Sequence, residues 1–255
     1  MTKTEHVRIK YRLTFLSAFH FGTGLRAGTI HRVVARGADN FLYVPGSTMK
    51  GILRERCEQL AHLFNLNAHE PHTEEIAIRQ ANAKVNIIPR IFGSQFYPAQ
   101  LYFDDLALSE EGRALFEPAA GGQISKMKRK EFQAWQTENR TQVTLSRLTN
   151  TARRQHLFTS EYGIRALSFD GQIVGALTGF PLLSGDVGTF PLLLLIAGLS
   201  SLDNDHIGGN KSTGAGKIRC KIESFTIDSE EYVAAAILQQ LEDLELYELA
   251  GDEEE

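Results

Sequence analysis

The chain has few cysteines and no long apolar segment. Its 255 residues include only Cys57 and Cys220, which is too few for a disulfide framework. The longest apolar stretch runs from Phe190 to Leu199. It falls short of the roughly 18–20 residues that a membrane-spanning helix needs and predicts a buried helix instead. The first residues carry no signal-peptide pattern, so we expect a cytoplasmic protein without a membrane partner.

Basic residues are absent from the C-terminal end. Residues 228–255 hold 11 acidic side chains and no lysine or arginine, whereas the whole chain carries 27 basic and 31 acidic residues. Residues 1–227 therefore hold 27 basic against 20 acidic residues, a formal charge of +7 that the overall value of −4 conceals. A basic body is compatible with a polyanionic ligand, although an acidic end is equally typical of a solvated helix.

The pattern of apolar residues predicts an α+β protein with one domain over residues 1–227 and an acidic C-terminal helix and tail over 228–255. Strands are expected over 6–19, 41–44, 101–108 and 217–227 and in two pieces, 166–169 and 173–177, that flank Asp170-Gly171. Helices are expected over 48–66, 187–202 and 229–249. Ser229 would cap the last helix, with Glu230 and Glu231 in its first turn. Residues 67–86 have no clear period and predict an exposed excursion. The order of elements favours an antiparallel ferredoxin-like sheet with long insertions.

A turn that leads into a helix start forms the most informative motif, Val44-Pro-Gly-Ser-Thr-Met-Lys-Gly-Ile-Leu-Arg54. Ser47 and Thr48 offer hydroxyls where the helix is expected to begin, and Lys50 and Arg54 lie one turn apart on the same face. Backbone N–H groups at a helix start, followed by two cations, suit a phosphate. The motif therefore predicts an anion site.

A second motif is rich in glycine, Gly208-Gly-Asn-Lys-Ser-Thr-Gly-Ala-Gly216. It resembles a P-loop, but Asn210 stands where that motif needs glycine, and the segment leads into a strand rather than a helix. The glycines around residues 22–28 fail as a dinucleotide fingerprint because they too precede an extended segment. Glycines let a backbone approach a ligand closely, with Lys211 and Ser212 as polar contacts. A flexible surface turn would have the same composition.

Two strand-like arms over about 142–163 enclose a basic tip. The tip carries Arg147, Arg153, Arg154 and His156. Arginine suits a phosphate because its planar guanidinium donates two hydrogen bonds at once. The pattern predicts a hairpin that presents cations to a polyanion, although a solvated hairpin tip would have the same pattern.

Residues that could bind a metal lack a recognised spacing. His62, His69 and His72 have no cysteine nearby. Asp104 and Asp105 follow an apolar strand, where a structural role is the simpler interpretation. We therefore predict no resident metal site.

Together these motifs resemble those of a known family. In chain order they are Phe19-His-Phe-Gly-Thr-Gly24, Tyr43-Val-Pro-Gly-Ser-Thr-Met-Lys-Gly51 with Arg54, Phe92-Gly93 with Leu101-Tyr-Phe-Asp104, residues 149–162 with Glu161, and Gly208–Gly216. Over roughly residues 8–227 the chain is similar to the RAMP (repeat-associated mysterious protein) superfamily, specifically to backbone subunits of type III CRISPR effector complexes.

The resemblance implies a palm like an RNA-recognition motif, which is an antiparallel sheet with helices on one face, and a β-hairpin thumb. Residues 142–163 would form this thumb, which enters the duplex of guide and target RNA at regular intervals. The residues that would hold the guide RNA backbone are His20, Ser47, Lys50, Arg54 and Lys211. Such contacts suit a guide of variable sequence, because base pairing then supplies the specificity.

One departure from the family pattern concerns cleavage. Target-cleaving members carry an aspartate after the first strand, in a pattern like Gly-x-Ile-Asp, where this chain has Gly28-Thr-Ile-His31. Three interpretations stay open: an inactive backbone subunit, transfer of the role to Asp39, or general acid–base catalysis by His31. A divalent metal such as Mg²⁺ would be the cofactor of a metal-assisted cleavage, and without it the RNA 2′-hydroxyl would attack.

We therefore expect a guide-RNA-binding backbone subunit of a type III CRISPR interference complex. Its partners would be the guide RNA, the target RNA and the other effector subunits. The alternative is an endoribonuclease that trims guide-RNA precursors with His31. A third hypothesis is a structural assembly protein whose acidic tail docks onto a basic neighbour.

Overall fold

The structure, a computed structural model, describes residues 3–63, 87–94, 98–120, 126–180, 190–235 and 238. The excursion predicted over 67–86 lies outside these residues. No helix within these ranges is long and apolar enough to cross a membrane.

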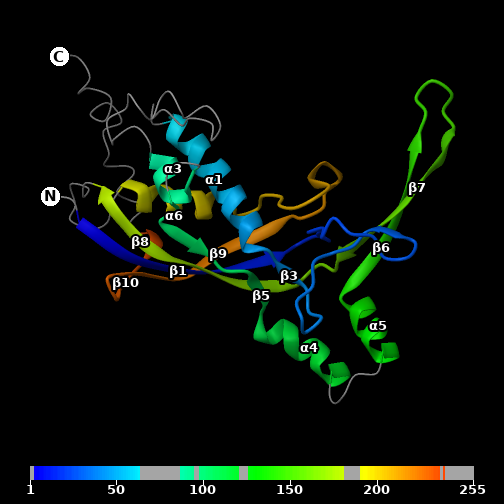
Figure 1. The fold of residues 1–255 in the computed structure, drawn as a ribbon, viewed down its shortest axis with the longest axis horizontal. Coiled ribbons are helices and arrows are strands. Elements are labelled where there is room, and N and C mark those ends of the chain that lie inside the picture. Colours follow the sequence, from blue (N-terminus) through cyan, green and yellow to red (C-terminus); the bar gives the residue numbers. More distant parts are fainter. Residues whose placement is uncertain are drawn as a thin grey trace.

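An antiparallel sheet forms the body of the protein (Figure 1). It has seven strands, and each pair among them runs antiparallel. In order from one edge the strands are β10 (Glu230–Tyr232), β9 (Ile218–Ile227), β1 (Lys3–Phe15), β8 (Ser168–Phe180), β5 (Leu106–Leu108) and β3 (Tyr43–Val44), and β4 (Leu101–Phe103) also pairs with β8.

The central strand β1 shows which face of the sheet is buried. Val7, Ile9, Tyr11, Leu13 and Phe15 alternate with polar residues, and each is at most 3% exposed. Successive side chains of a strand point to opposite faces, so these five lie on one side. The helices that cover this side are α1 (Gly46–Leu63), α3 (Ile87–Phe92) and α6 (Phe190–Ser201) (Figure 1).

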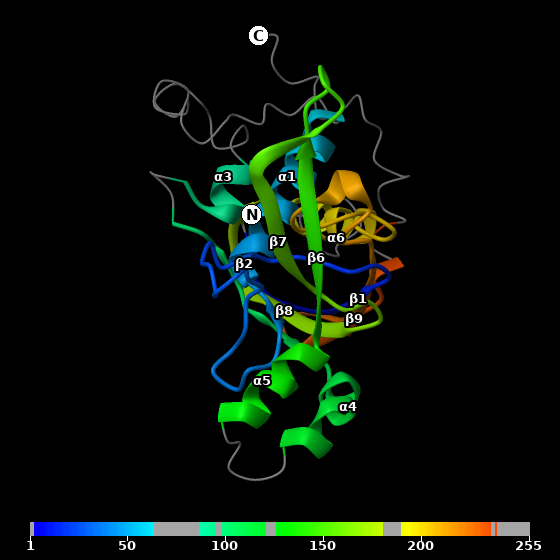
Figure 2. The same cartoon turned by 90° about the vertical axis from the view of Figure 1, so that its right-hand side faces the viewer.

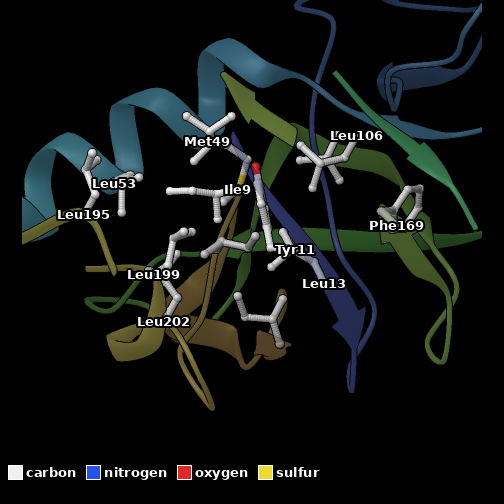
Figure 3. Close-up of a cluster of buried hydrophobic side chains, with 14 of the residues drawn as sticks. Ile9, Tyr11, Leu13, Met49, Leu53, Leu106, Phe169, Leu195, Leu199 and Leu202 are labelled. Carbon is white, nitrogen blue, oxygen red and sulfur yellow. The ribbon is translucent and has the colours of Figure 1, made fainter. Parts of the chain in front are cut away.

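Side chains from α1 and α6 close the core over β1. Met49 and Leu53 of α1 lie with Leu195 and Leu199 of α6 around Ile9 (Figure 3), and none of the five is more than 1% exposed. Burial of one such side chain stabilises the fold by about 1.5–3 kcal/mol. This layer therefore holds α1, whose first turns carry Ser47 and Lys50, in place on the sheet.

The order of elements is that of a ferredoxin-like fold. The elements β1, α1, β5, β8, α6 and β9 follow one another along the chain, and the strands lie in the spatial order β9-β1-β8-β5. The prediction of an α+β fold with an antiparallel sheet is confirmed, and the helices α1, α3 and α6 lie on one face of it as expected.

A long hairpin stands away from this body (Figures 1 and 2). Its strands are β6 (Thr137–Leu145) and β7 (Ala152–Gly163), and β2 (Ile30–Arg32) pairs in parallel with β7. The hairpin thus begins before residue 142, where the sequence indicated its start. The helices α4 (Glu110–Ala120) and α5 (Lys126–Trp135) precede it and lie on the side of the sheet opposite to α1 (Figure 1).

The end of the described chain corrects one prediction. The sequence predicts a helix that starts at Ser229, but residues 230–232 form β10, which pairs with β9. Asp228 and Ser229 both have positive φ, 48° and 78°, as in a tight hairpin turn. Asp228 also accepts a hydrogen bond from the His6 backbone N–H, which ties this turn to β1. Ser229 is therefore not a helix cap, and the predicted helix start is wrong.

Candidate nucleic-acid interface

The glycine segment, residues 208–216, is packed against the chain that follows β1. The backbone N–H of Gly209 donates to the His20 carbonyl at 2.9 Å, and that of Gly216 donates to Ala18 at 2.8 Å. Gly216 has a φ of 76°, and a Cβ there would overlap the Ile207 carbonyl oxygen, so glycine is required. The segment is held on both sides rather than being a loose surface turn.

The middle of the glycine segment presents its polar side chains to solvent. Lys211, Ser212 and Thr213 form a single 3₁₀ turn, η1 (Lys211–Thr213), and all three are exposed. Asn210 starts this turn in the left-handed conformation, with a φ of 61°. The Lys211 ammonium has no carboxylate partner among the described residues. The structure thus places Lys211 and Ser212 where an anion can reach them.

His20 connects the glycine segment with the hairpin. Its ring Nδ1 lies 2.7 Å from the Glu161 carbonyl oxygen of β7, so Nδ1–H is the donor. Its own carbonyl accepts the bond from Gly209. The residue is only 6% exposed. This burial suits a support beneath the RNA-facing residues better than the direct phosphate contact that the family resemblance implies.

The root of the hairpin is held by a buried ion pair. The Glu161 carboxylate accepts from Arg36 at 2.6 Å, from the Thr137 hydroxyl at 2.9 Å and from the Val34 backbone N–H at 3.1 Å. The two charged side chains are only 11% and 10% exposed. Because these partners come from β6 and from the segment after β2, they fix the angle at which the hairpin leaves the body.

The buried amide of Gln136 adds a second attachment at the root. Its oxygen accepts from the Leu42 backbone N–H at 3.0 Å, and its nitrogen donates to the Asn40 and Phe132 carbonyls at 3.2 and 3.3 Å. All the partners of this side chain are main-chain atoms, and they satisfy an amide that is fully buried. The hairpin is therefore anchored at its base while its tip remains free.

The tip of the hairpin carries the cations that the sequence predicts. Arg147, Arg153 and His156 are exposed, and none of them belongs to an ion pair of the described residues. The side chain of Arg154 lies outside the described part. Leu148 at the same tip is 94% exposed. The tip thus offers charge and one apolar side chain to a partner.

The start of α1 is partly occupied by a carboxylate of the chain itself and is not an empty anion site. The Gly46 backbone N–H donates to the Asp105 carboxylate at 2.7 Å, so a carboxylate of the chain itself occupies part of the helix N-terminus. Ser47 is exposed, Thr48 and Lys50 are half-buried, and no described carboxylate pairs with Lys50. A phosphate would therefore meet the hydroxyls and the lysine rather than an empty helix end.

Arg54 has partners within the chain. Its Nε donates to Glu58 at 2.7 Å, and Nη1 donates to the Gly93 carbonyl at 3.0 Å. The side chain is 18% exposed and joins α1 to the turn after α3. The structure thus gives Arg54 a structural role and does not pair it with Lys50 as a second solvent-facing cation.

The two catalytic candidates are held by different parts of the fold. His31 is exposed on β2, and its Nδ1 accepts from the Thr159 backbone N–H at 3.2 Å, so Nε2 carries the proton of the neutral ring. Asp39 accepts from the Phe41 N–H at 3.2 Å and pairs with Arg113 of α4 at 3.1 Å. The carboxylate of Asp39 thus serves a turn, whereas His31 lies beside the hairpin.

The face of the sheet opposite to α1, α3 and α6 is charged rather than aromatic. Arg12 pairs there with Asp170 at 2.6 Å, Glu223 at 3.2 Å and Glu111 at 3.6 Å, and its hydrogen bond to Asp170 raises the pKa of Arg12. Among the described strand residues of this sheet, Tyr102 is the one exposed large aromatic, at 66%. Sheets that bind RNA stack two or three bases on aromatic side chains. Among the described strands, this face therefore lacks a set of aromatic side chains on which bases could stack.

A hollow on the same face is acidic. It has a volume of about 420 Å³ and is lined by Asp104, Asp105, Asp170 and Glu223, with Lys10 as the one cation. Carboxylates repel phosphate, so the hollow is unsuited to RNA. Over the described ranges, no group of three or more histidine, cysteine or carboxylate side chains could hold a metal. Of the three histidines considered for zinc, His69 and His72 lie outside those ranges.

Comparison with known proteins identifies the family. In structure, the chain is similar to a chain of the type III-B Cmr-beta complex bound to cognate target RNA, with a TM-score of 0.54 and 10% identity over 84% of this chain and 96% of that one. The apo state of Cmr-beta gives a TM-score of 0.55 and 10% identity over 85% and 97%. No curated protein matches in sequence. The family model of the RAMP superfamily matches residues 12–219, and the chain therefore belongs to the RAMP superfamily.

Proposed function

We propose that the chain is a guide-RNA-binding backbone subunit of a type III CRISPR effector complex. The observation that carries this proposal is the attachment of the glycine segment, with Lys211 and Ser212 exposed, to the root of a hairpin that has a cationic tip. Membership of the RAMP superfamily and the similarity to Cmr-beta chains support it. The target RNA and the other effector subunits would be the further partners, and the complex would act in the cytoplasm.

The side chains available for RNA favour recognition of the backbone over recognition of bases. Lysine, arginine and hydroxyl groups bind phosphate and sugar oxygens, which every nucleotide carries. The charged face of the sheet offers no set of stacking aromatics among the described strands. A surface of this kind would accept a guide of any sequence and leave specificity to base pairing.

Salt-dependent RNA binding tests the proposal. Affinity of the full chain for two labelled single-stranded RNAs of unrelated sequence would be measured over a range of salt concentrations. We expect Lys50→Ala with Lys211→Ala to weaken both complexes alike and to lower the slope of log affinity against log salt by about 0.7 per lost contact. Lys221→Ala is the matched control, because Lys221 is exposed beside Arg12 on the face opposite to α1. Absence of any salt-sensitive RNA affinity would refute the proposal.

RNA cleavage by His31 is a second candidate activity, and the exposure of this residue beside the hairpin supports it. As a general acid the ring would first take up a proton at Nδ1, which breaks the hydrogen bond from Thr159, and the imidazolium would then give its Nε2 proton to the leaving 5′-oxygen. The RNA 2′-hydroxyl would attack the phosphorus and pass its proton to a base or to solvent. We expect His31→Ala to abolish cutting of a guide precursor or target and to preserve binding. Unchanged cutting by this variant would remove the candidate.

A further inference from the structure

Arg140 of the hairpin lies on the side of β6 that faces the glycine segment. Neighbouring residues of β7 point to opposite faces: Glu161 binds Arg36, while Tyr162 contacts Asn210 of the glycine segment. The Arg140 guanidinium lies over the Tyr162 ring, 4.8 Å from its centre. Arg140 therefore shares a face with Tyr162, on the side away from the buried ion pair.

Tyr162 links two cations that come from separate elements. Its ring is 1% exposed and supports Arg140, and its hydroxyl accepts a hydrogen bond from the Asn210 side chain. Asn210 in turn begins the 3₁₀ turn that presents Lys211. One buried tyrosine thus positions an arginine of the hairpin and a lysine of the glycine segment.

Glu138 restrains Arg140 in the absence of a ligand. The Nε and Nη2 atoms of Arg140 both lie 2.6 Å from the same Glu138 oxygen, and the two side chains are 43% and 44% exposed. An exposed pair of this kind is weak because water screens it. A phosphate, which accepts two hydrogen bonds from a guanidinium, can therefore displace the carboxylate.

We propose that Arg140 is a further phosphate-binding residue, positioned by Tyr162 on the side of the hairpin that contacts the glycine segment, and that Glu138 competes with the RNA phosphate for it. The inference rests on the proposed RNA-binding function and adds a contact that the sequence did not indicate. It has an unusual consequence, because loss of the competing carboxylate strengthens RNA binding rather than weakening it.

Four variants of the full chain test the inference with a labelled single-stranded RNA as the probe. Log affinity for single strands changes with log salt by about 0.7 per phosphate contact. We therefore expect the ratio of wild-type to Arg140→Ala affinity to be about fivefold larger at about 0.1 M salt than at about 1 M. Glu138→Gln should tighten binding about two- to fivefold, because the RNA phosphate then no longer has to break the exposed ion pair between Glu138 and Arg140. The double variant should bind like Arg140→Ala. Arg219→Ala is the control, because Arg219 is an exposed arginine paired with Thr14 on β1.

The outcomes separate this inference from the proposed function. If the wild type shows no salt-sensitive RNA affinity, the proposed function fails. If the wild type binds and Lys211→Ala weakens it, but Arg140→Ala equals the control, the inference alone is overturned. A gain from Glu138→Gln that persists without Arg140 would also overturn it, because the gain would then come from charge at a distance. Thermal unfolding of each variant shows that the fold is retained.

Discussion

Replacing Glu161 with glutamine removes the carboxylate that neutralises Arg36 at the root of the hairpin. The other acceptors of this guanidinium are neutral, namely the Gln133 carbonyl at 3.3 Å and the Thr137 hydroxyl at 3.4 Å. The Arg36 Nη1 atom is buried and has no hydrogen-bond partner among the described residues. The variant therefore leaves a buried cation without a countercharge.

The size of the effect follows from the burial of both partners. At 11% and 10% exposure, water screens Arg36 and Glu161 little. Removal of one member of such a pair costs about 3–5 kcal/mol, whereas replacement of both by apolar groups is often neutral. We expect Glu161→Gln to lower the free energy of unfolding by about 3 kcal/mol, near the low end, because glutamine keeps one oxygen that can still accept from Arg36 and Thr137, although its amide nitrogen replaces the oxygen that accepts from Val34.

Denaturant unfolding and thermal unfolding measure this loss. For a chain of this length 1 kcal/mol shifts the midpoint by about 2–4 °C, so the expected decrease is about 6–12 °C. The companion variants are Arg36→Met and the double variant Arg36→Met with Glu161→Gln, which together form a double-mutant cycle. The double variant should be more stable than Glu161→Gln alone. A Glu161→Gln protein within about 0.5 kcal/mol of wild type would refute the argument, since surface substitutions change stability that little.

Three further predictions concern other side chains. Asp39→Asn should leave any RNA cleavage unchanged and lower stability by no more than about 1 kcal/mol, since its ion pair with Arg113 of α4 is open to solvent at 45% and 36% exposure; a nuclease assay in which cutting disappears would contradict this. Tyr162→Phe and Lys211→Ala should be non-additive in RNA affinity, because the tyrosine positions the lysine; additive losses would exclude such positioning. Cys57 and Cys220 should resist a thiol reagent at pH 8 until the protein unfolds, because burial raises both pKa values, that of Cys220 to about 12; rapid labelling of the native protein would be inconsistent with this.

The fold could be predicted from the sequence where one periodicity dominates. The alternating apolar residues of β1 predicted a strand with one buried face, and the apolar run of α6 predicted a buried helix. The structure contains both elements. Two predictions based on local turn signals failed for a tertiary reason. Asp170-Gly171 does not interrupt β8, because Asp170 pairs with Arg12 of the neighbouring strand and Gly171 makes room for the Tyr11 ring. Ser229 does not cap a helix, because β10 gains backbone hydrogen bonds from β9.

The helices before the hairpin were not predicted, and their burial explains why. Among the described side chains of α4 and α5, the buried large apolar ones are Phe116 and Phe132, while Leu115 and Trp135 are 71% and 57% exposed. Such segments lack the continuous apolar stripe by which a helix is recognised in sequence. The contact between Phe116 and Phe132, 6.4 Å between ring centres, forms only after the chain has folded back.

The residues assigned to the candidate site differ between sequence and structure for an electrostatic reason that the sequence does not show. A motif gives the position of a cation, but the usefulness of that cation to RNA depends on its partners within the fold. Arg54 lies inside a predicted phosphate motif, yet Glu58 and the Gly93 carbonyl hold its guanidinium. Arg140 lies in no motif, yet the ring of Tyr162, which also contacts Asn210, supports it, with only an exposed carboxylate to displace. The two arginines thus differ in the strength of their internal competitors, and the response of RNA affinity to removal of Glu138 measures that difference directly.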